Sequence, residues 1–473
     1  MNRSLWIGLG LLVTTMGYGS VLAQDWKEQI GYNRLKTEVG AGLENGAGVS
    51  VSLVEAGGAD FTFLPDSTNA EFTGKTITNG TGVAANNSGH ATSVAQTMFG
   101  NVSSIAAGVT NITAYDAANW ILTRNNVGGI GNPLPNPFSV QNHSYVGSGL
   151  GNSVATETLA RFDFLINRDG VTSVVGMDNS GSTVLPELLG QAYNSISVGQ
   201  TGGGHGRGET TLGTIGRIKP EIVAPAGSSS TATAMVSSAA TLLHQKAANM
   251  GALDARQPET MKAIIMAGAT KTEFAGWNQG STAGVITRPL DATFGAGELN
   301  VYNSYRILEG GEFDGSTATV QAAAVAFKGW DYGEALAANN QMNWTIEVGA
   351  GQVISDASLL LTWNAQYADA NGNFVNSRTL ANMRLQIWDS TSAFKGSLLA
   401  TSDSQIDNVE HLFLQNLAAG KYTFGVTSDL ATDFGMAWNF NITAVPEPSS
   451  FLCLSLAGLA LIGHRRWRRN RNN

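Results

Sequence analysis

Residues 219–243 read KPEIVAPAGSSSTATAMVSSAATLL and combine three kinds of local structure in one stretch. The apolar pair Ile222–Val223 is typical of a short buried strand, and the Pro-Ala-Gly sequence after it favours a sharp turn. No glycine or proline occurs between Ser228 and Asn249, which predicts a long helix of mostly small residues. The stretch therefore predicts a strand, a loop and a helix, with the hydroxyl of Ser230 at the start of the helix.

The position of Ser230 has two interpretations. The first N–H groups of a helix are unpaired and carry positive potential, which suits a nucleophile whose attack creates an oxyanion. Serine-rich segments before helices are also typical of ordinary N-terminal capping. The residues of this stretch leave both interpretations open.

The same stretch resembles the nucleophile region of the subtilisin family of serine peptidases. The family pattern is Lys-Pro-Asp-Ile-Val-Ala-Pro-Gly, then Gly-Thr-Ser-x-Ala-x-Pro, and KPEIVAPAG matches it nearly throughout. The resemblance puts the nucleophile at Ser230. The chain departs from the pattern at five places, where it has Ser228, Ser229, Ala234, Met235 and Ser238.

Two upstream segments resemble the other catalytic motifs of that family. Residues 46–58 (GAGVSVSLVEAGG) alternate like a buried strand, and the resemblance puts the family's catalytic aspartate at Glu55. Residues 88–101 (SGHATSVAQTMFGN) resemble the family's histidine helix, with the base at His90. A surface carboxylate for Glu55 and a structural histidine for His90 are the alternatives. The order acid, histidine, serine is that of subtilisin, a known template.

Two further segments complete the resemblance, which spans residues 46–309. Residues 139–149 (SVQNHSYVGSG) resemble the strand that holds the substrate backbone, which implies substrate contacts at Ser144, Tyr145 and Val146. Residues 170–181 (GVTSVVGMDNSG) resemble the strand that ends in the oxyanion-hole asparagine, here Asn179. A turn asparagine is the alternative for Asn179.

The resemblance implies a fold and a reaction. The fold expected is an α/β parallel-sheet sandwich over residues 24–311, and the activity is serine endopeptidase cleavage of protein or peptide substrates, with no metal or organic cofactor. Glu55 replaces the family's aspartate and is longer by one methylene, and Ala91 is bulkier than the family's glycine. A catalytically weak or inactive protein, acting in binding or as a structural surface component, is therefore the alternative.

Residues 312–444 differ in their pattern of apolar residues from the segment before them. Apolar residues alternate between Gly, Asp and Asn turns, as in Tyr422-Phe424-Val426, which predicts an all-β sandwich of about eight strands. This region resembles the jelly-roll-like domain that follows many secreted bacterial peptidases. Asp403, Asp407 and Glu410 are its candidate ligands for a structural Ca²⁺ ion, and a solvated turn cluster is the favoured alternative.

Both ends of the chain resemble sorting signals. Residues 1–23 have the basic start, apolar run and small-residue end of a secretory signal peptide. Residues 445–473 resemble the PEP-CTERM signal, with a Val-Pro-Glu-Pro box, a short apolar segment and an arginine cluster. The resemblance implies export to the envelope or exterior of a Gram-negative bacterium, recognition by an exosortase, and transient or permanent membrane association through the tail.

The charge balance of the exported body argues against one class of partner. Without the two ends, 21 basic residues remain against 35 acidic residues, a net charge of −14. Such a body does not attract nucleic acid electrostatically, so we expect no nucleic-acid partner. Cys453 is the only cysteine in the sequence, which excludes an internal disulfide framework.

Overall fold

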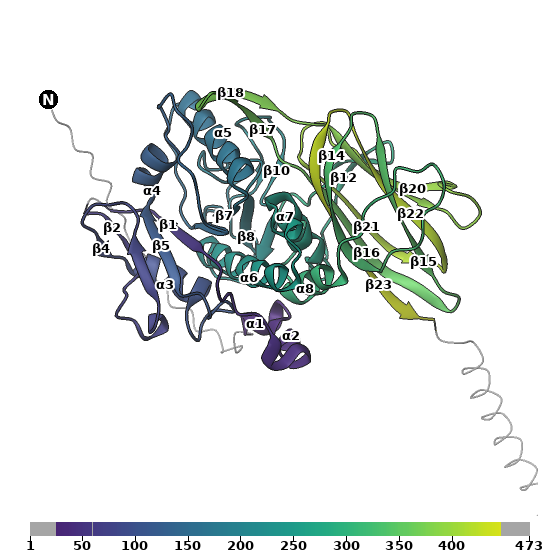
Figure 1. Ribbon diagram of the computed structural model, residues 1–473, viewed down its shortest axis with the longest axis horizontal. Coiled ribbons are helices and arrows are strands. Elements are labelled where there is room, and N and C mark those ends of the chain that lie inside the picture. Colours follow the sequence, from purple (N-terminus) through teal and green to yellow (C-terminus); the bar gives the residue numbers. More distant parts are fainter. Residues whose placement is uncertain (1–24, 59, 446–473) are drawn as a thin grey trace, which may run out of the picture.

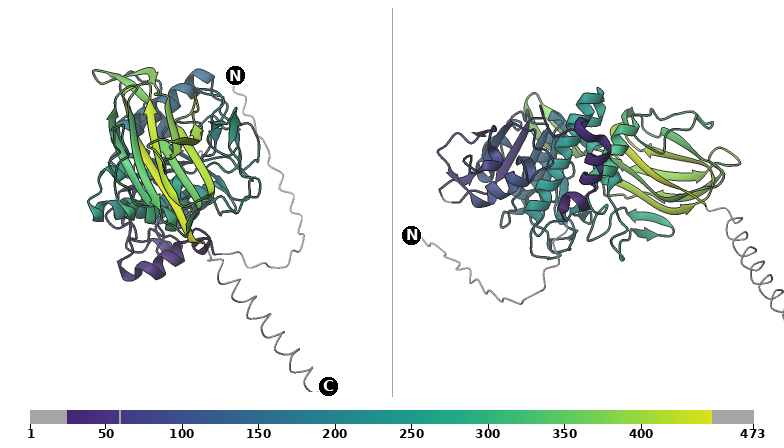
Figure 2. Two further views of the ribbon diagram at one scale, coloured as in Figure 1. Left: turned by 90° about the vertical axis from the view of Figure 1, so that its right-hand side faces the viewer. Right: turned by 90° about the horizontal axis from the view of Figure 1, so that it is seen from below.

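The computed structural model describes residues 25–58 and 60–445 (Figure 1). The predicted signal peptide, residues 1–23, and all but the first residue of the predicted sorting tail lie outside the described residues. The described chain forms two parts that lie next to each other, a helix-covered sheet followed by a β-sandwich (Figure 2). Within these ranges, the helices are all too short or too polar to span a bilayer.

The first part is built on a seven-stranded sheet in which every neighbouring pair is parallel. This confirms the predicted α/β class. In spatial order the strands are β11 (Ile222–Ala224), β8 (Ile196–Gln200), β7 (Thr172–Gly176), β6 (Val140–His143), β1 (Val51–Glu55), β5 (Asn111–Asp116) and β3 (Thr76–Asn79).

Helices cover both faces of this sheet because its strands are apolar on both sides. Leu53 and Val174 belong to a core cluster with α3 (Gly89–Phe99) and α6 (Ser229–Met250), whereas their neighbours Val54 and Val175 pack with α5 (Asn152–Asp169). Successive side chains of a strand point to opposite faces, so the two clusters are the two sides of one sheet. The small residues of α6 let this long helix lie deep in the core.

Shorter elements complete the first part. The closing helices are α7 (Pro258–Gly268) and α8 (Val301–Gly310). Before β1, α1 (Trp26–Gln29) and α2 (Tyr32–Val39) lie on α8, where Arg34 donates to the Tyr302 hydroxyl at 2.8 Å. This part also contains the short elements β2 (Thr62–Leu64), β4 (Asn86–Asn87), α4 (Ala117–Asn119), β9 (Gly208–Glu209) and β10 (Ile218–Lys219).

The second part is an all-β sandwich with its own core, which includes Trp344, Leu359 and Phe424. One sheet has the order β12 (Gly280–Thr282), β13 (Val285–Arg288), β20 (Ser397–Ser402), β19 (Met383–Asp389), β22 (Gly420–Ser428) and β15 (Gln341–Val348). The other has the order β14 (Lys328–Leu336), β23 (Thr432–Ala444), β16 (Gln352–Thr362) and β21 (Val409–Leu417). The C-terminal region thus gives eight strands to the two sheets, close to the number predicted.

Two hairpins cross between the parts. The β12–β13 hairpin precedes residue 312, where the sequence places the boundary, yet β13 pairs with β20 of the sandwich. In the opposite direction, β17 (Gln366–Ala370) and β18 (Asn373–Thr379) leave the sandwich and lie along α5 (Figure 1). Their contacts include an Asn132–Asp369 hydrogen bond of 2.8 Å and the Arg161 guanidinium over the Phe374 ring.

The two parts also pack directly against each other. Helix α7 lies on β23 and β16, where the Thr362 hydroxyl donates to the Glu259 carbonyl at 2.5 Å. Gly435 of β23 lies so close to α7 that an added Cβ would be 2.5 Å from the backbone N and Cα of Thr260. A side chain at this position would push the sandwich off α7.

Candidate active site

The strand order marks the side of the parallel sheet where the strands have their carboxyl ends as the place for a site. From β1 the chain goes to the edge strand β3, comes back to β5 next to β1, and then continues in β6 on the other side of β1. In open α/β sheets, ligands bind outside the carboxyl ends of the strands at such a switch point. Glu55 is the last residue of β1, Ser144 directly follows β6 and Asn179 follows β7. Three predicted site residues therefore lie at these carboxyl ends.

Glu55 and His90 are in direct contact. The Glu55 Oε2 atom is 2.6 Å from His90 Nδ1, and the Glu55 side chain is 2% exposed whereas that of His90 is 53% exposed. Ser88 caps α3 through a bond from the Ala91 N–H, which fixes the first turn that carries His90. Within the described residues, Glu55 Oε1 is buried without a hydrogen-bond partner. The contact agrees with the resemblance and excludes the alternative of a surface carboxylate for Glu55.

The segment after Glu55 is held by the neighbouring strand. The Gly57 N–H donates to Asp116 Oδ2 at 3.1 Å, and a Cβ at Gly57 would be 2.2 Å from the same oxygen. Asp116 is paired with Glu55 in the register of β1 and β5. The glycine therefore allows the close approach that fixes the end of β1.

Burial and the Glu55–His90 contact together change the pKa values of both side chains. Burial raises the pKa of Glu55, and its hydrogen bond with His90 opposes that shift. The same hydrogen bond raises the pKa of His90, against the effect of desolvation. The hydrogen bond with Glu55 thus favours the protonated imidazole of His90, so this imidazole accepts a proton more readily, which is the property a general base requires.

Ser230 lies in the first turn of α6, as the sequence predicts. Ser228 is the N-cap and accepts from the Thr231 N–H at 3.3 Å, and Ser144 Oγ donates to the Ser230 carbonyl at 3.1 Å. The Ser230 N–H has no hydrogen-bond acceptor among the described residues. The described chain also shows no hydrogen bond between His90 and Ser230. A catalytic triad is expected to have two hydrogen bonds. Among the described residues, the bond between Glu55 and His90 is present, and the bond between His90 and Ser230 is not formed.

Asn179 is fixed against the same helix end. Its Oδ1 atom accepts from the Ser229 N–H at 2.8 Å and from Gln200 Nε2 at 2.7 Å. Its own amide nitrogen has no partner in the part of the chain that the structure describes, and the residue is exposed. A free side-chain N–H and the free Ser230 N–H are the two kinds of donor that an oxyanion hole uses.

Ser144, Tyr145 and Val146 lie beyond the end of β6 rather than inside a strand. Ser144 bonds to Ser230 as described, and Tyr145 is 8% exposed in a core cluster that includes Trp120 and Phe162. Only Val146 is largely exposed, at 43%. The side chains of Ser144 and Tyr145 thus support the wall of the site, and a contact with substrate at these two residues would be made by their backbone.

The candidate Ca²⁺ ligands do not form a metal site in the structure. Glu410 is completely buried and accepts from Ser402 Oγ and Ser404 N, while Asp407 accepts from Ser404 Oγ at 2.7 Å. The solvated turn cluster favoured from the sequence is wrong for these two carboxylates, because serine donors replace water there. In residues 25–58 and 60–445, no three His, Cys, Asp or Glu side chains are arranged to hold a metal ion.

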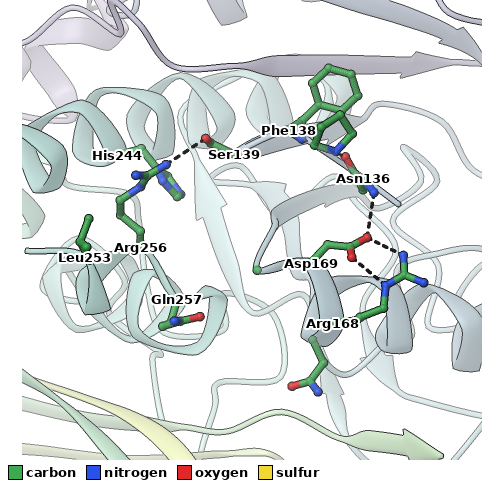
Figure 3. Close-up of a pocket in the computed structure, with 12 residues that line it drawn as sticks. Asn136, Phe138, Ser139, Arg168, Asp169, His244, Leu253, Arg256 and Gln257 are labelled. Carbon is green, nitrogen blue, oxygen red and sulfur yellow. Dashed lines mark hydrogen bonds and ion pairs between the residues drawn. The ribbon is translucent and has the colours of Figure 1, made fainter. Parts of the chain in front are cut away.

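A polar cavity of about 440 Å³ lies at the opposite edge of the sheet (Figure 3). Its lining includes Ser139, just before β6, and Gly170, just before β7. Arg256 donates to Ser139 Oγ at 3.3 Å, and Arg168 is paired with Asp169. The helix α5 also ends at this cavity, because Asp169 and its C-cap Gly170 are among the lining residues. This cavity is thus separate from the residues around Glu55.

Comparisons with a family model, with curated proteins and with solved structures give three different results. Residues 444–470 match the family model described as the PEP-CTERM protein-sorting motif. The chain ends in a PEP-CTERM motif. A comparison with curated proteins finds no match by sequence.

Among solved structures, the chain is similar to several proteases, one of which is described as subtilisin-like. Patellamide maturation protease PatA is 19% identical, with 57% of this chain and 98% of that chain covered and a TM-score of 0.36. The serine protease of Aeromonas sobria is 11% identical, with 84% and 89% covered and a TM-score of 0.39. A cold adapted subtilisin-like serine proteinase is 16% identical, with 49% and 86% covered and a TM-score of 0.36. With scores this low, the fold class rests on the order and pairing of the strands.

One residue of the site was not found from the sequence. Gln200 donates to Asn179 Oδ1, and the sequence predicts no role for this glutamine. Its partner could not be identified because the two residues are far apart in sequence and meet only in the folded sheet.

Proposed function

We propose that this chain is an exported serine endopeptidase that uses Glu55, His90 and Ser230. The observation that carries the proposal is the 2.6 Å contact between Glu55 and His90 at the switch point of the sheet. The placement of Ser230 in the first turn of α6, at the N-terminal end that favours negative charge, supports it further.

In the proposed reaction, Ser230 Oγ attacks the carbonyl carbon of a peptide bond. His90 Nε2 takes the hydroxyl proton as the new C–O bond forms, and then donates it to the leaving amine. Glu55 holds the imidazole by Nδ1 and offsets its positive charge. The amide of Asn179 and the Ser230 N–H stabilise the oxyanion of the intermediate.

This reaction requires His90 and Ser230 to approach each other when substrate is present. Catalytic hydrogen bonds are often long without substrate and shorten in the Michaelis complex. His90 is half exposed and α3 packs against α6, so a rotation of the imidazole would be enough to change its distance from the hydroxyl.

A second candidate function is binding without catalysis. Two observations favour it: the His90–Ser230 hydrogen bond is absent between these described residues, and Glu55 Oε1 has no partner. Such a protein would keep the fold and the site around Glu55, and would hold a peptide or envelope component without cleaving it.

Labelling with a fluorophosphonate separates the two functions. A peptidase is expected to react at Ser230, and Ser230→Ala is expected to abolish the label while Ser93→Ala, a change on the exposed side of α3, retains it. The labelled peptide is identified by mass spectrometry. An intact, folded protein that takes no label and does not cleave casein would support the binding function instead.

The tail extends the proposal to the location of the protein. The PEP-CTERM motif at residues 444–470 supports recognition by an exosortase-type sorting system, and with it export to the envelope or exterior of a Gram-negative bacterium. The substrates would then be proteins or peptides of that compartment, and the tail would provide membrane association before or without its removal.

A further inference from the structure

The Asn179 carbonyl is held by two donors from different elements. The Ser229 N–H, in the first turn of α6, donates to Asn179 Oδ1 at 2.8 Å. Gln200 Nε2, at the end of β8, donates to the same oxygen at 2.7 Å. Both lone pairs of the carbonyl are thus occupied, and the amide group is clamped between a helix and a strand.

These contacts allow only one orientation of each amide. A backbone N–H can only donate, so the Asn179 atom that faces Ser229 must be the oxygen and not the nitrogen. Gln200 must then present its nitrogen to that oxygen. The Asn179 NH₂ group is consequently directed away from both donors, toward the exposed side of the residue.

Gln200 itself is fixed by the surrounding structure. It is 7% exposed, and its second amide hydrogen faces the Gly204 carbonyl at 3.5 Å. Its backbone N–H donates to His205 Nδ1 at 2.9 Å, and His205 Nε2 in turn lies 2.8 Å from the Thr293 carbonyl. A side chain held at both ends can hold its neighbour with little loss of conformational entropy.

We infer that Gln200 is a positioning residue, which holds the Asn179 amide in the orientation that directs its N–H toward the substrate oxyanion. The inference rests on the proposed peptidase function. Gln200 does not touch the substrate in this account and acts only through Asn179. Such support is required because a donor misplaced by about 1 Å can cost on the order of 10²-fold in rate.

Two substitutions of Gln200 separate positioning from packing. Gln200→Ala removes the donor, so the Asn179 amide gains freedom, and we expect the maximal rate of fluorophosphonate labelling at Ser230 to fall about tenfold. Gln200→Glu keeps the shape but places a carboxylate oxygen opposite Asn179 Oδ1. We expect a larger fall, because two acceptors then face each other and the amide must rotate. The half-saturating concentration of the probe is expected to change less than twofold.

The decisive comparison is made in the absence of the Asn179 amide. Asn179→Ala is expected to lower the maximal rate by about 10²–10³-fold, the usual cost of one oxyanion donor. Adding Gln200→Ala to Asn179→Ala should lower it no further. Gln245→Ala is the matched control: this glutamine also uses its amide to fix backbone, at residues 45–47, but lies in the last turns of α6 away from Asn179. It is expected to leave the labelling rate unchanged.

A crystal structure of the Gln200→Ala variant keeps the inference testable if the wild-type protein takes no label. No label on the wild type contradicts the proposed function, whereas an Asn179 side chain that turns or becomes disordered in the variant still supports positioning by Gln200. The inference is overturned if Asn179 keeps its orientation in that crystal structure. It is equally overturned if Gln200→Ala slows labelling as much in the Asn179→Ala protein as in the wild type.

Discussion

Glu55→Asp is the substitution that tests the site most sharply, because it restores the family's own residue. The Glu55 carboxylate lies 2.6 Å from His90 Nδ1, and the backbone of β1 is fixed by pairs on both sides. Aspartate is shorter by one carbon–carbon bond, about 1.5 Å. If the strand does not move, the gap widens to about 4 Å, beyond the 3.2 Å limit of a good hydrogen bond.

The loss of this bond sets the size of the expected effect. A displacement of the order of 1 Å or more in a catalytic contact costs about 10²-fold in rate, so we expect kcat/KM of Glu55→Asp to fall by about that factor. Glu55→Gln keeps the length but removes the charge and permits the wrong imidazole tautomer. Its loss should be larger, about 10³–10⁴-fold, as in other enzymes with a triad.

The assay compares both variants with the wild type in the rate of fluorophosphonate labelling and in the cleavage of one fluorogenic peptide. Thermal unfolding of each protein is the control for folding. Because burial disfavours the Glu55 carboxylate and Oε1 has no partner, Glu55→Gln is expected to keep or raise the melting temperature while activity falls. An Asp variant as active as the wild type would refute the reasoning, since it would show that the length of Glu55 is not matched to His90.

Three other predictions concern pH and the junction of the two parts. The hydrogen bond with Glu55 raises the pKa of His90, so activity should fall as pH decreases through a value above 6.5. Glu55→Gln should move the acidic limb of the pH–rate profile to lower pH. An unmoved limb would show that Glu55 does not control the pKa of His90. Burial lowers the pKa of Lys271 to about 7, so the unfolded state binds more protons between pH 7 and 10.5, and the unfolding free energy should rise with pH in that window. Lys271→Met should remove this rise in chemical denaturation, and an equal rise in the variant would exclude Lys271 as its source. Gly435→Ala puts a Cβ against the backbone of α7, so we expect the unfolding free energy to fall by about 1–3 kcal/mol. Gly372→Ala is the control, because this glycine has open space around it although its φ is positive, and it should cost less. Calorimetry that finds the larger loss in Gly372→Ala would contradict the steric argument.

Local sequence was enough for the elements that carry the site. Alternating apolar residues predict β1, and the serine cap followed by a run without glycine predicts α6, because strand and helix periodicities are properties of short segments. The family resemblance added the pairing of Glu55 with His90, which the structure shows as a direct contact. No periodicity could have supplied it, since the two residues belong to different elements.

The tertiary structure decided how distant segments meet. The β12–β13 hairpin, which ends at Arg288, joins a sheet whose other strands all begin at Gln341 or later, and Gln200 reaches Asn179 only because β7 and β8 are neighbours. Glu410 is buried among serine donors although its sequence is that of a polar turn. The sequence by itself determined the α/β part, the β part, their order and the catalytic candidates. Strand pairing and side-chain contacts between distant residues depend on which edges and faces come together in the folded chain, and that is decided only by packing.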